Sequence, residues 1–184
     1  GWLLNVSDPA LIPRYLHFIA SAVAIGGLAI ALYFEIRKRR GATDGEAWIK
    51  LGCKWFTVAT IINFGFGFWF LGALPAAAYN AATLGGKIFF ILVVGSVVTI
   101  IPSMVSAQTG RIIPAASWAL VTVLLMTLAR DILRLTYLKP YFSLAELPYV
   151  PQYSPFIVFL LAFVGAGFLV GWMLKTVWNT KEVA

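Results

Sequence analysis

The chain has a single histidine, His17, which falls about two turns inside the first long apolar stretch of the sequence. Arg14 lies three residues earlier, so the two side chains share one face of a helix. An imidazole can bind a haem iron or hydrogen-bond a quinone, and a nearby guanidinium can hold a haem propionate. Ionisable groups at membrane depth are costly and are retained mostly where they act. His17 is therefore the first candidate for a functional site.

A second set of ionisable residues is expected at the same membrane face as His17. Arg130 and Arg134 are one turn apart on the fourth apolar stretch, and two guanidinium groups so placed suit a carboxylate, a pair of haem propionates or a phosphate. Asp131 can neutralise part of their charge, and Lys87 falls at a similar depth on the third stretch. The competing interpretation is that the arginines extend to lipid headgroups.

Composition fixes the class of protein. Of 184 residues, 61% are hydrophobic and only 11% are charged, and the mean hydropathy is +0.89. A membrane-spanning helix needs ~20 apolar residues. Stretches of that kind recur at residues 11–34, 47–74, 86–106, 114–138 and 155–177. We expect an all-α integral membrane protein, a bundle of five transmembrane helices that forms a single domain over residues 1–184.

Local signals predict where the helices begin and how their polar residues are satisfied. The motif SDP at residues 7–9 predicts that the first helix begins near its proline, which places His17 roughly 12 Å into the helix. Asp44 is expected to cap the second helix. On the third, Ser96, Thr99 and Ser103 are expected to hydrogen-bond to their own helix.

Glycines alternate with aromatic residues in GFGFWFLG, residues 65–72, near the end of the second stretch. They could leave a slot beside the helix for a flat ring. The other interpretation, which we favour, is close helix packing with an aromatic belt at the membrane interface. Small residues of the first stretch, Ser21, Gly26 and Gly27, also predict close helix contact.

The net charge of +7 indicates topology rather than nucleic-acid binding, because the basic residues fall mainly at helix ends. The dense run RKRR at residues 37–40 places that end of the first helix inside. We expect the N-terminus outside and the C-terminus inside, in the cytoplasmic (inner) membrane of a prokaryote. The inner ends then carry Arg37, Lys38, Arg39, Arg40, Lys50, Lys54, Arg111, Lys175 and Lys181, and the outer ends Arg14, Lys87, Arg130, Arg134 and Lys139.

The sequence excludes several chemistries for this chain alone. One thiol, Cys53, permits no internal disulfide, no covalent C-x-x-C-H haem attachment and no cysteine-ligated iron–sulfur cluster. One histidine and seven acidic residues spread over both sides do not assemble a catalytic triad or a paired-carboxylate site.

A b-type haem with two imidazole ligands would need a second histidine, so the second axial ligand to a haem at His17 must come from elsewhere or be missing. Met104 and Met173 lie near the inner end, and Met126 is about one turn too deep. Lys87 is at the right depth, although an interfacial cation is its more ordinary role.

Two short motifs carry a family resemblance. PRYLHFI at residues 13–19, followed by GGL at residues 26–28, resembles the opening helix of small membrane cytochrome-b-like and CopD-like proteins, and the first helix of subunit I of cytochrome bd quinol oxidases. The match covers one helix and, more loosely, GFWFLGALP at residues 67–75. It implies a haem-ligand role near the outer face for His17 alone. The further histidine and methionine ligands and the quinol loop of the cytochrome bd family are missing from this chain. The resemblance therefore implies a relative of that family or an accessory subunit.

Together these features predict a membrane subunit of a respiratory or electron-transfer complex, with a haem b or quinone site near the outer face. His17 is its centre, as ligand to a haem iron, and Arg14, Arg130, Arg134 and Lys87 are the other binding residues. Expected partners are the lipid bilayer and other membrane subunits, with a cytochrome c or another redox subunit on the outer side, and no nucleic acid. Two alternatives stay open: a non-catalytic scaffold that binds lipid and partner subunits, and a CopD-like metal-handling permease.

Overall fold

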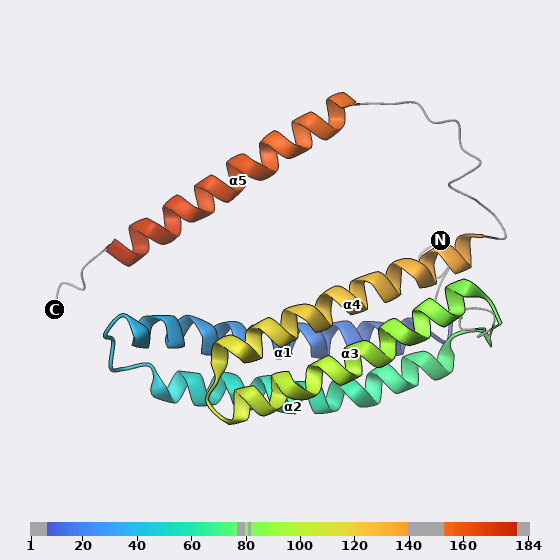
Figure 1. The fold of residues 1–184 in the computed structure, drawn as a ribbon, viewed down its shortest axis with the longest axis horizontal. Helices are drawn as coiled ribbons and strands as arrows, with labels where there is room; N and C mark the ends of the chain where they lie inside the picture. The colour runs from blue at the N-terminus through green and yellow to red at the C-terminus, as the bar shows by residue number, and fades with distance from the viewer. Residues whose placement is uncertain (1–6, 77–79, 81, 140–152, 180–184) are drawn as a thin grey trace. The chain divides into compact units, whose positions relative to one another are not determined.

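The computed structural model describes residues 7–76, 80, 82–139 and 153–179. Residues 177–179 are described by their backbone alone. Its regular structure over these residues is α-helical: α1 spans Leu11–Arg39, α2 Glu46–Ala73, α3 Leu84–Gln108, α4 Ile112–Leu138 and α5 Tyr153–Asn179 (Figure 1). The prediction of five helices is confirmed. All five are long and apolar enough to cross a membrane, which indicates a multi-pass membrane protein.

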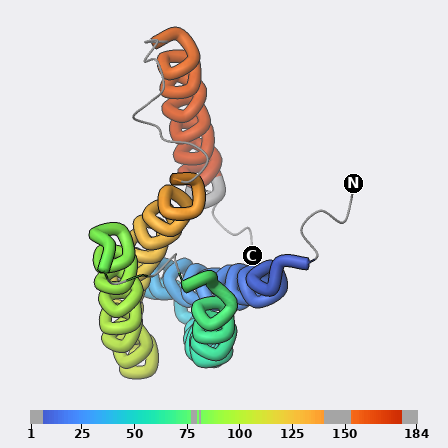
Figure 2. The backbone as a smooth tube through the Cα atoms, turned by 90° about the vertical axis from the view of Figure 1, so that its right-hand side faces the viewer, coloured from blue at the N-terminus to red at the C-terminus, as the bar shows by residue number. Residues whose placement is uncertain are grey.

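The chain divides into two units, residues 1–142 and 143–184. Within the first unit, α1 packs along α2 and α3 packs along α4, and the two pairs meet through fewer contacts (Figure 2). In the second unit, the side chains of α5 up to residue 176 are all exposed. The expectation that residues 1–184 form a single domain stays a prediction.

Small residues bring α1 and α2 into their closest contact. A Cβ atom at Gly27 would lie 2.8 Å from the carbonyl oxygen of Gly52, and one at Gly52 would lie 2.5 Å from the carbonyl oxygen of Gly27. Gly26 has no neighbour among the described residues within 4 Å of its Cβ position, so Gly27 is the glycine of this pair that serves the contact. Close backbone approach of this kind increases the van der Waals packing that helps helices associate in lipid.

Buried side chains form two clusters, one toward each end of the first unit. The cluster at the end where α1 finishes contains Ala24, Leu28, Ala31, Ile49, Cys53, Phe56, Ala59, Ala107, Ile112, Ala115 and Ala119. The cluster at the other end contains Ala10, Leu74, Phe89, Ala129 and Leu133. His17 and its neighbours lie between these clusters along α1 and α2.

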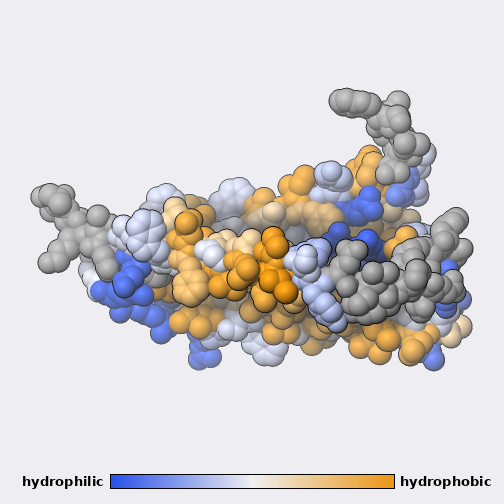
Figure 3. All heavy atoms as spheres, turned by 90° about the horizontal axis from the view of Figure 1, so that it is seen from above, coloured by the Kyte–Doolittle hydropathy of each residue, from blue (hydrophilic) through white to orange (hydrophobic). Residues whose placement is uncertain are grey.

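The outward surface of the helices is apolar. Large side chains such as Phe18, Ile62, Phe90 and Leu124 are more than half exposed. In Figure 3 apolar side chains cover the middle of the visible surface, and hydrophilic ones gather toward the ends. A soluble protein rarely exposes so continuous an apolar surface, whereas lipid would cover it at no cost. The helices therefore suggest lipid contact.

The first helix begins two residues later than the SDP motif predicts. Its N-cap is Ala10, which carries no side-chain cap, and the helix starts at Leu11. The Asp8 carboxylate instead accepts the Ala10 backbone N–H at 3.0 Å, in the turn that precedes the helix. His17 consequently lies about 9 Å into α1 at ~1.5 Å per residue.

The prediction that Asp44 caps the second helix is wrong. The N-cap of α2 is Gly45, and no side chain caps it. Asp44 lies 3.9 Å from the Arg37 guanidinium, so its carboxylate faces the cationic end of α1 instead of the first turn of α2.

Two of the three α3 hydroxyls with a predicted bond, those of Ser96 and Thr99, behave as predicted. Ser96 donates to the Val93 carbonyl and Thr99 to the Gly95 carbonyl of the same helix. The prediction for Ser103 is wrong, because its hydroxyl donates across the α3–α4 contact to the Ala115 carbonyl at 2.7 Å. Ser103 is fully buried between the two helices, which brings a carbonyl of α4 within reach.

Candidate functional site

His17 lies in the contact between α1 and α2. Its ring faces Gly67 of α2, where a Cβ atom would stand 3.4 Å from the imidazole Cε1 and Nδ1 atoms. The Phe70 ring lies one turn further along α2, nearly parallel to the imidazole, with 6.5 Å between ring centroids. The residue as a whole is partly buried. The edge of the imidazole that carries Nδ1 and Cε1 therefore packs against a glycine on the neighbouring helix.

The glycine-rich end of α2 could leave a slot for a flat ring or pack closely against another helix. At Gly67 the close packing of α1 on α2 accounts for the glycine. Gly67 does leave a notch for a flat ring, and the ring that fills it is the imidazole of His17. Gly65 and Gly72 have no neighbour within 4 Å of their Cβ positions among the described residues. One glycine of the three thus shapes the surroundings of the histidine.

Asn63 is the polar neighbour of His17 on α2. It precedes Gly67 by one helical turn, and its side chain lies within interaction range of the imidazole. The amide Nδ2 donates a hydrogen bond of 2.8 Å to the Ser21 hydroxyl, and Ser21 follows His17 by one turn of α1. Three polar side chains from two helices therefore form one cluster at membrane depth.

Two atoms of this cluster are buried without a hydrogen-bond partner: the His17 Nδ1 and the Asn63 Oδ1. Buried polar atoms in native proteins are nearly always paired. A protonated Nδ1 is a donor and an amide oxygen is an acceptor, so the two atoms are chemically complementary. One hydrogen bond from Nδ1 to Oδ1 would satisfy both atoms.

Arg14 is half-buried on α1, one turn before His17. Tyr137, in the last turn of α4, lies within electrostatic range of both Arg14 and Asp8. The start of α1 and the end of α4 are thus close together. The structure brings Arg14 toward the turn of α4 that follows Arg134.

The other candidate binding residues are not in contact with His17. Lys87, Arg130, Asp131 and Arg134 are exposed, and their side chains make no hydrogen bond or ion pair within the described part of the chain. Asp131 does not pair with either arginine there. In this part of α4 the buried residues are Ala129 and Leu133, and not the arginines.

Within the part of the chain that the structure describes, no second axial ligand to a haem lies at the imidazole of His17. Met104 packs against the buried cluster at the far end of the first unit, as its sequence position predicts. Among the described residues there is no group of three or more His, Cys, Asp or Glu side chains.

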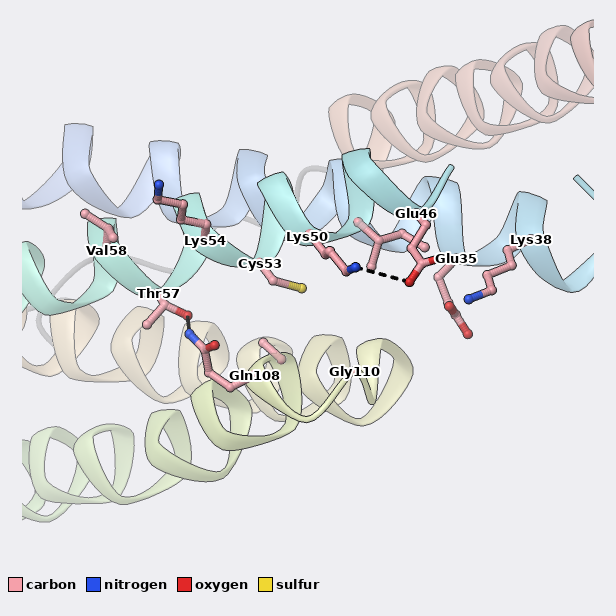
Figure 4. Close-up of a pocket in the computed structure, with 12 residues that line it drawn as sticks. Glu35, Lys38, Glu46, Lys50, Cys53, Lys54, Thr57, Val58, Gln108 and Gly110 are labelled. Atoms are coloured by element: carbon pink, nitrogen blue, oxygen red, sulfur yellow. Dashed lines mark hydrogen bonds and ion pairs between the residues drawn. The ribbon is translucent and has the colours of Figure 1, made fainter. Parts of the chain in front are cut away.

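An open pocket of about 500 Å³ lies at the opposite end of the helices from His17. Figure 4 shows its polar side chains: Lys50 pairs with Glu46 at 3.3 Å, and the Gln108 amide donates to the Thr57 hydroxyl at 2.8 Å. Lys54 lines the same pocket and makes no ion pair within the described residues.

The remaining charged side chains of the pocket come from the end of α1. Glu35 accepts a 2.8 Å bond from Arg39, whereas Lys38 forms no ion pair in the described ranges. The buried Cys53 also lines the wall. With both carboxylates already paired, the uncompensated charge of the pocket is positive.

Comparison with known proteins gives no match to this chain: no family model, no curated protein and no solved structure is similar to it. The resemblance to cytochrome-b-like and CopD-like proteins therefore stays a prediction.

Sequence reasoning found His17 but missed its partners. Asn63, Gly67 and Phe70 recur at i, i+4 and i+7 on α2, and His17 and Ser21 at i and i+4 on α1. That spacing puts each set on one helix face. An asparagine inside an apolar helix was the available signal, because polar side chains in membrane helices usually bond to a neighbouring helix.

Proposed function

We propose that this chain is a five-span protein of a prokaryotic cytoplasmic membrane, with its N-terminus outside and its C-terminus inside. Five helices that are long and apolar enough to cross a membrane support insertion. The basic end of α1, with Arg37, Lys38 and Arg39 in its last turn, supports the orientation. His17 then lies in the outer half of the membrane, and the lysine-lined pocket lies at the inner surface.

We further propose that the chain is a subunit of an electron-transfer complex that binds a haem b or a quinone at His17. The observation that carries this proposal is the buried, unpaired Nδ1 beside the unpaired Asn63 oxygen, on an imidazole that is otherwise partly exposed. A histidine that binds a metal through one nitrogen typically donates from the other to a carbonyl or carboxylate oxygen. The cluster fits that requirement, since Asn63 can serve as the acceptor.

The residues of the chain would have distinct roles at such a site. His17 would present Nε2 to the haem iron or to a hydroxyl of the reduced quinone, and Gly67 would hold the Nδ1 edge of the ring against α2. Arg14, half-buried on the same helix face, is the guanidinium best placed for an anionic group near the imidazole. The exposed Lys87, Arg130 and Arg134 would bind anionic groups at the outer edge of the site. A bound haem or quinone would supply the reversible electron transfer.

The optical spectrum of the complex purified in mild detergent tests this proposal. His17→Ala should remove a b-type Soret band, or quinol-linked turnover, while the chain still inserts into the membrane. Thr99→Ala, which changes a polar residue of α3 away from the site, is the control and should keep both. An unchanged spectrum and unchanged turnover in His17→Ala would exclude the site.

One observation favours the alternative of a scaffold that binds lipid and partner subunits. Lys50, Lys54 and Val58 follow one another at successive turns of α2 along the inner pocket, and Val58 is 42% exposed. The two lysines could bind the headgroup of an anionic phospholipid, and Val58 could contact its acyl chain. On that interpretation, Lys50→Gln with Lys54→Gln should lower the retention of anionic lipid and the yield of the complex, while His17→Ala should be silent. The CopD-like alternative has no comparable observation in its favour.

A further inference from the structure

We infer that Asn63, held in place by Ser21, fixes the neutral imidazole of His17 in the tautomer that carries its proton on Nδ1. Nε2 then presents a lone pair to whatever binds at the site. Such a nitrogen selects ligands that accept an electron pair or donate a hydrogen bond: a haem iron, or the hydroxyl of a reduced quinol, but not the carbonyl of an oxidised quinone. The tautomer is a property of the chain alone, whereas the ligand class rests on the proposed function.

The amide of Asn63 has a hydrogen-bond partner at one end only. Its Nδ2 donates to the Ser21 hydroxyl at 2.8 Å, so one end of the amide is committed to α1. The other end, Oδ1, is buried and has no partner. An unpaired buried amide oxygen costs roughly 1–3 kcal/mol. The cluster therefore has a strong requirement for one further hydrogen-bond donor.

The Nδ1 of His17 can be the donor that the Asn63 oxygen lacks. The His17 Nδ1 is the other buried atom of the cluster without a partner. If Nδ1 carries the proton, both atoms are satisfied by one hydrogen bond. If Nε2 carries it, Nδ1 is an acceptor and cannot donate to Oδ1, so the amide oxygen stays unpaired in the buried space, which penalises that tautomer.

Nε2 is the ring nitrogen of His17 that remains for a ligand. The imidazole is only partly buried, and its Nδ1 edge lies against Gly67, so Nε2 is the nitrogen left for a ligand. A neutral nitrogen without a proton cannot donate to a carbonyl oxygen. It can bind iron or accept the hydroxyl proton of a quinol. The geometry therefore narrows the ligand class that His17 alone would leave open.

The test uses the fact that the chain has one histidine. The full chain, labelled with ¹⁵N-histidine and purified in detergent without cofactor, gives one pair of ring ¹⁵N signals. Nitrogen NMR should show a protonated Nδ1 and an unprotonated Nε2. Asn63→Leu should move the tautomer ratio about fivefold toward protonated Nε2, the effect of removing a hydrogen bond of ~1 kcal/mol. A protonated Nε2 in the unmodified chain would overturn the inference.

Two further variants keep the test decisive if Asn63→Leu does not fold. Ser21→Ala removes the hydroxyl that holds the amide and should shift the ratio in the same direction by a smaller factor. Thr99→Val, a control on α3, should leave it unchanged. An equal shift in Ser21→Ala and Thr99→Val would contradict a specific role for Ser21.

Ligand binding separates the inference from the proposed function. The unmodified chain should retain a quinol analogue with free hydroxyls, or haem, more tightly than the matching oxidised quinone, and Asn63→Leu should reduce that preference. Stronger binding of the oxidised quinone would overturn the ligand class. Protonated Nδ1 together with no binding of any of the three ligands would leave the tautomer established and would refute the proposed redox function.

Discussion

The imidazole of His17 lies against the backbone of Gly67, where a Cβ atom would stand 3.4 Å from both Cε1 and Nδ1 of the ring. That distance is at the short end of ordinary van der Waals contact. The notch is therefore large enough for hydrogen, or at most a methyl group, at residue 67. Its size gives a graded way to move the histidine without changing it.

Gly67→Ala should be tolerated, because its methyl group just reaches the ring. Gly67→Leu should force the imidazole out of the notch, with a loss of ~1–3 kcal/mol in the free energy of unfolding from overpacking. The ¹⁵N spectrum of His17 and the thermal unfolding midpoint in detergent measure both effects. Gly65→Leu is the matched control, because residue 65 has no neighbour within 4 Å of its Cβ position among the described residues. Equal effects of the two leucines would show that the notch is unimportant.

The close contact of Gly27 with Gly52 makes a second prediction. Gly52→Ala places a methyl group 2.5 Å from a backbone oxygen, so α1 and α2 must separate and lose packing along their length. Unfolding in a denaturing detergent should show a loss of ~1–3 kcal/mol. Gly26→Ala, next to the contact but free of neighbours, should be neutral or should stabilise α1 by up to ~1 kcal/mol through helix propensity. The reverse order of stabilities would contradict this packing.

The number of helices and their approximate bounds follow from the sequence, because an apolar run of more than 20 residues is a strong and local signal. Helix ends are less certain, since a cap depends on small energies. Asp44 has the right residue type and spacing for a cap, but it faces the cation of Arg37. Ser103 has a carbonyl of its own helix available, yet it bonds to α4 because the helices meet at that residue.

The partners of His17 could not be predicted from sequence. Which side of α2 faces α1 depends on the rotation of each helix about its axis and on the register between them. Hydropathy does not reveal that rotation, because α2 is apolar on nearly all sides. The register is fixed by the Gly27–Gly52 contact, and each glycine alone is one of several in its helix. Only the assembled pair shows that Asn63 and Gly67, and not Gly65, face the histidine.

The contact between α3 and α4 contains a hydrogen bond between two threonines, which gives a third prediction. The Thr99 and Thr122 hydroxyl oxygens lie 2.9 Å apart. A double-mutant cycle with Thr99→Val and Thr122→Val should give a coupling energy of ~0.6 kcal/mol, typical of such bonds in membrane helices. Thr127 bonds only to its own helix, so a cycle of Thr99→Val with Thr127→Val should give none. Coupling of the same size in both cycles would remove the evidence for a specific interhelical bond.

The arginines give the last prediction, which separates the redox interpretation from the lipid interpretation. Arg14 is half-buried on the helix face of His17, whereas Arg130 and Arg134 are exposed on α4. Charge interactions strengthen as water is excluded. If an anionic group of a redox cofactor lies beside the imidazole, Arg14→Gln should shift the midpoint potential most, and a tenfold change in the relative stability of the two redox states corresponds to ~59 mV for one electron.

Redox titration of the complex measures these shifts, with Arg130→Gln and Arg134→Gln as variants that remove the same charge. We expect both α4 variants to change the potential less than Arg14→Gln, because their exposed side chains do not share the helix face of His17. They should instead lower the retention of anionic lipid, which the exposed side chains can reach. A larger redox shift from Arg130→Gln than from Arg14→Gln would place the anionic group on α4. Identical potentials in all three variants, with altered lipid content, would favour the scaffold function, because none of the three charges would then interact with a redox centre.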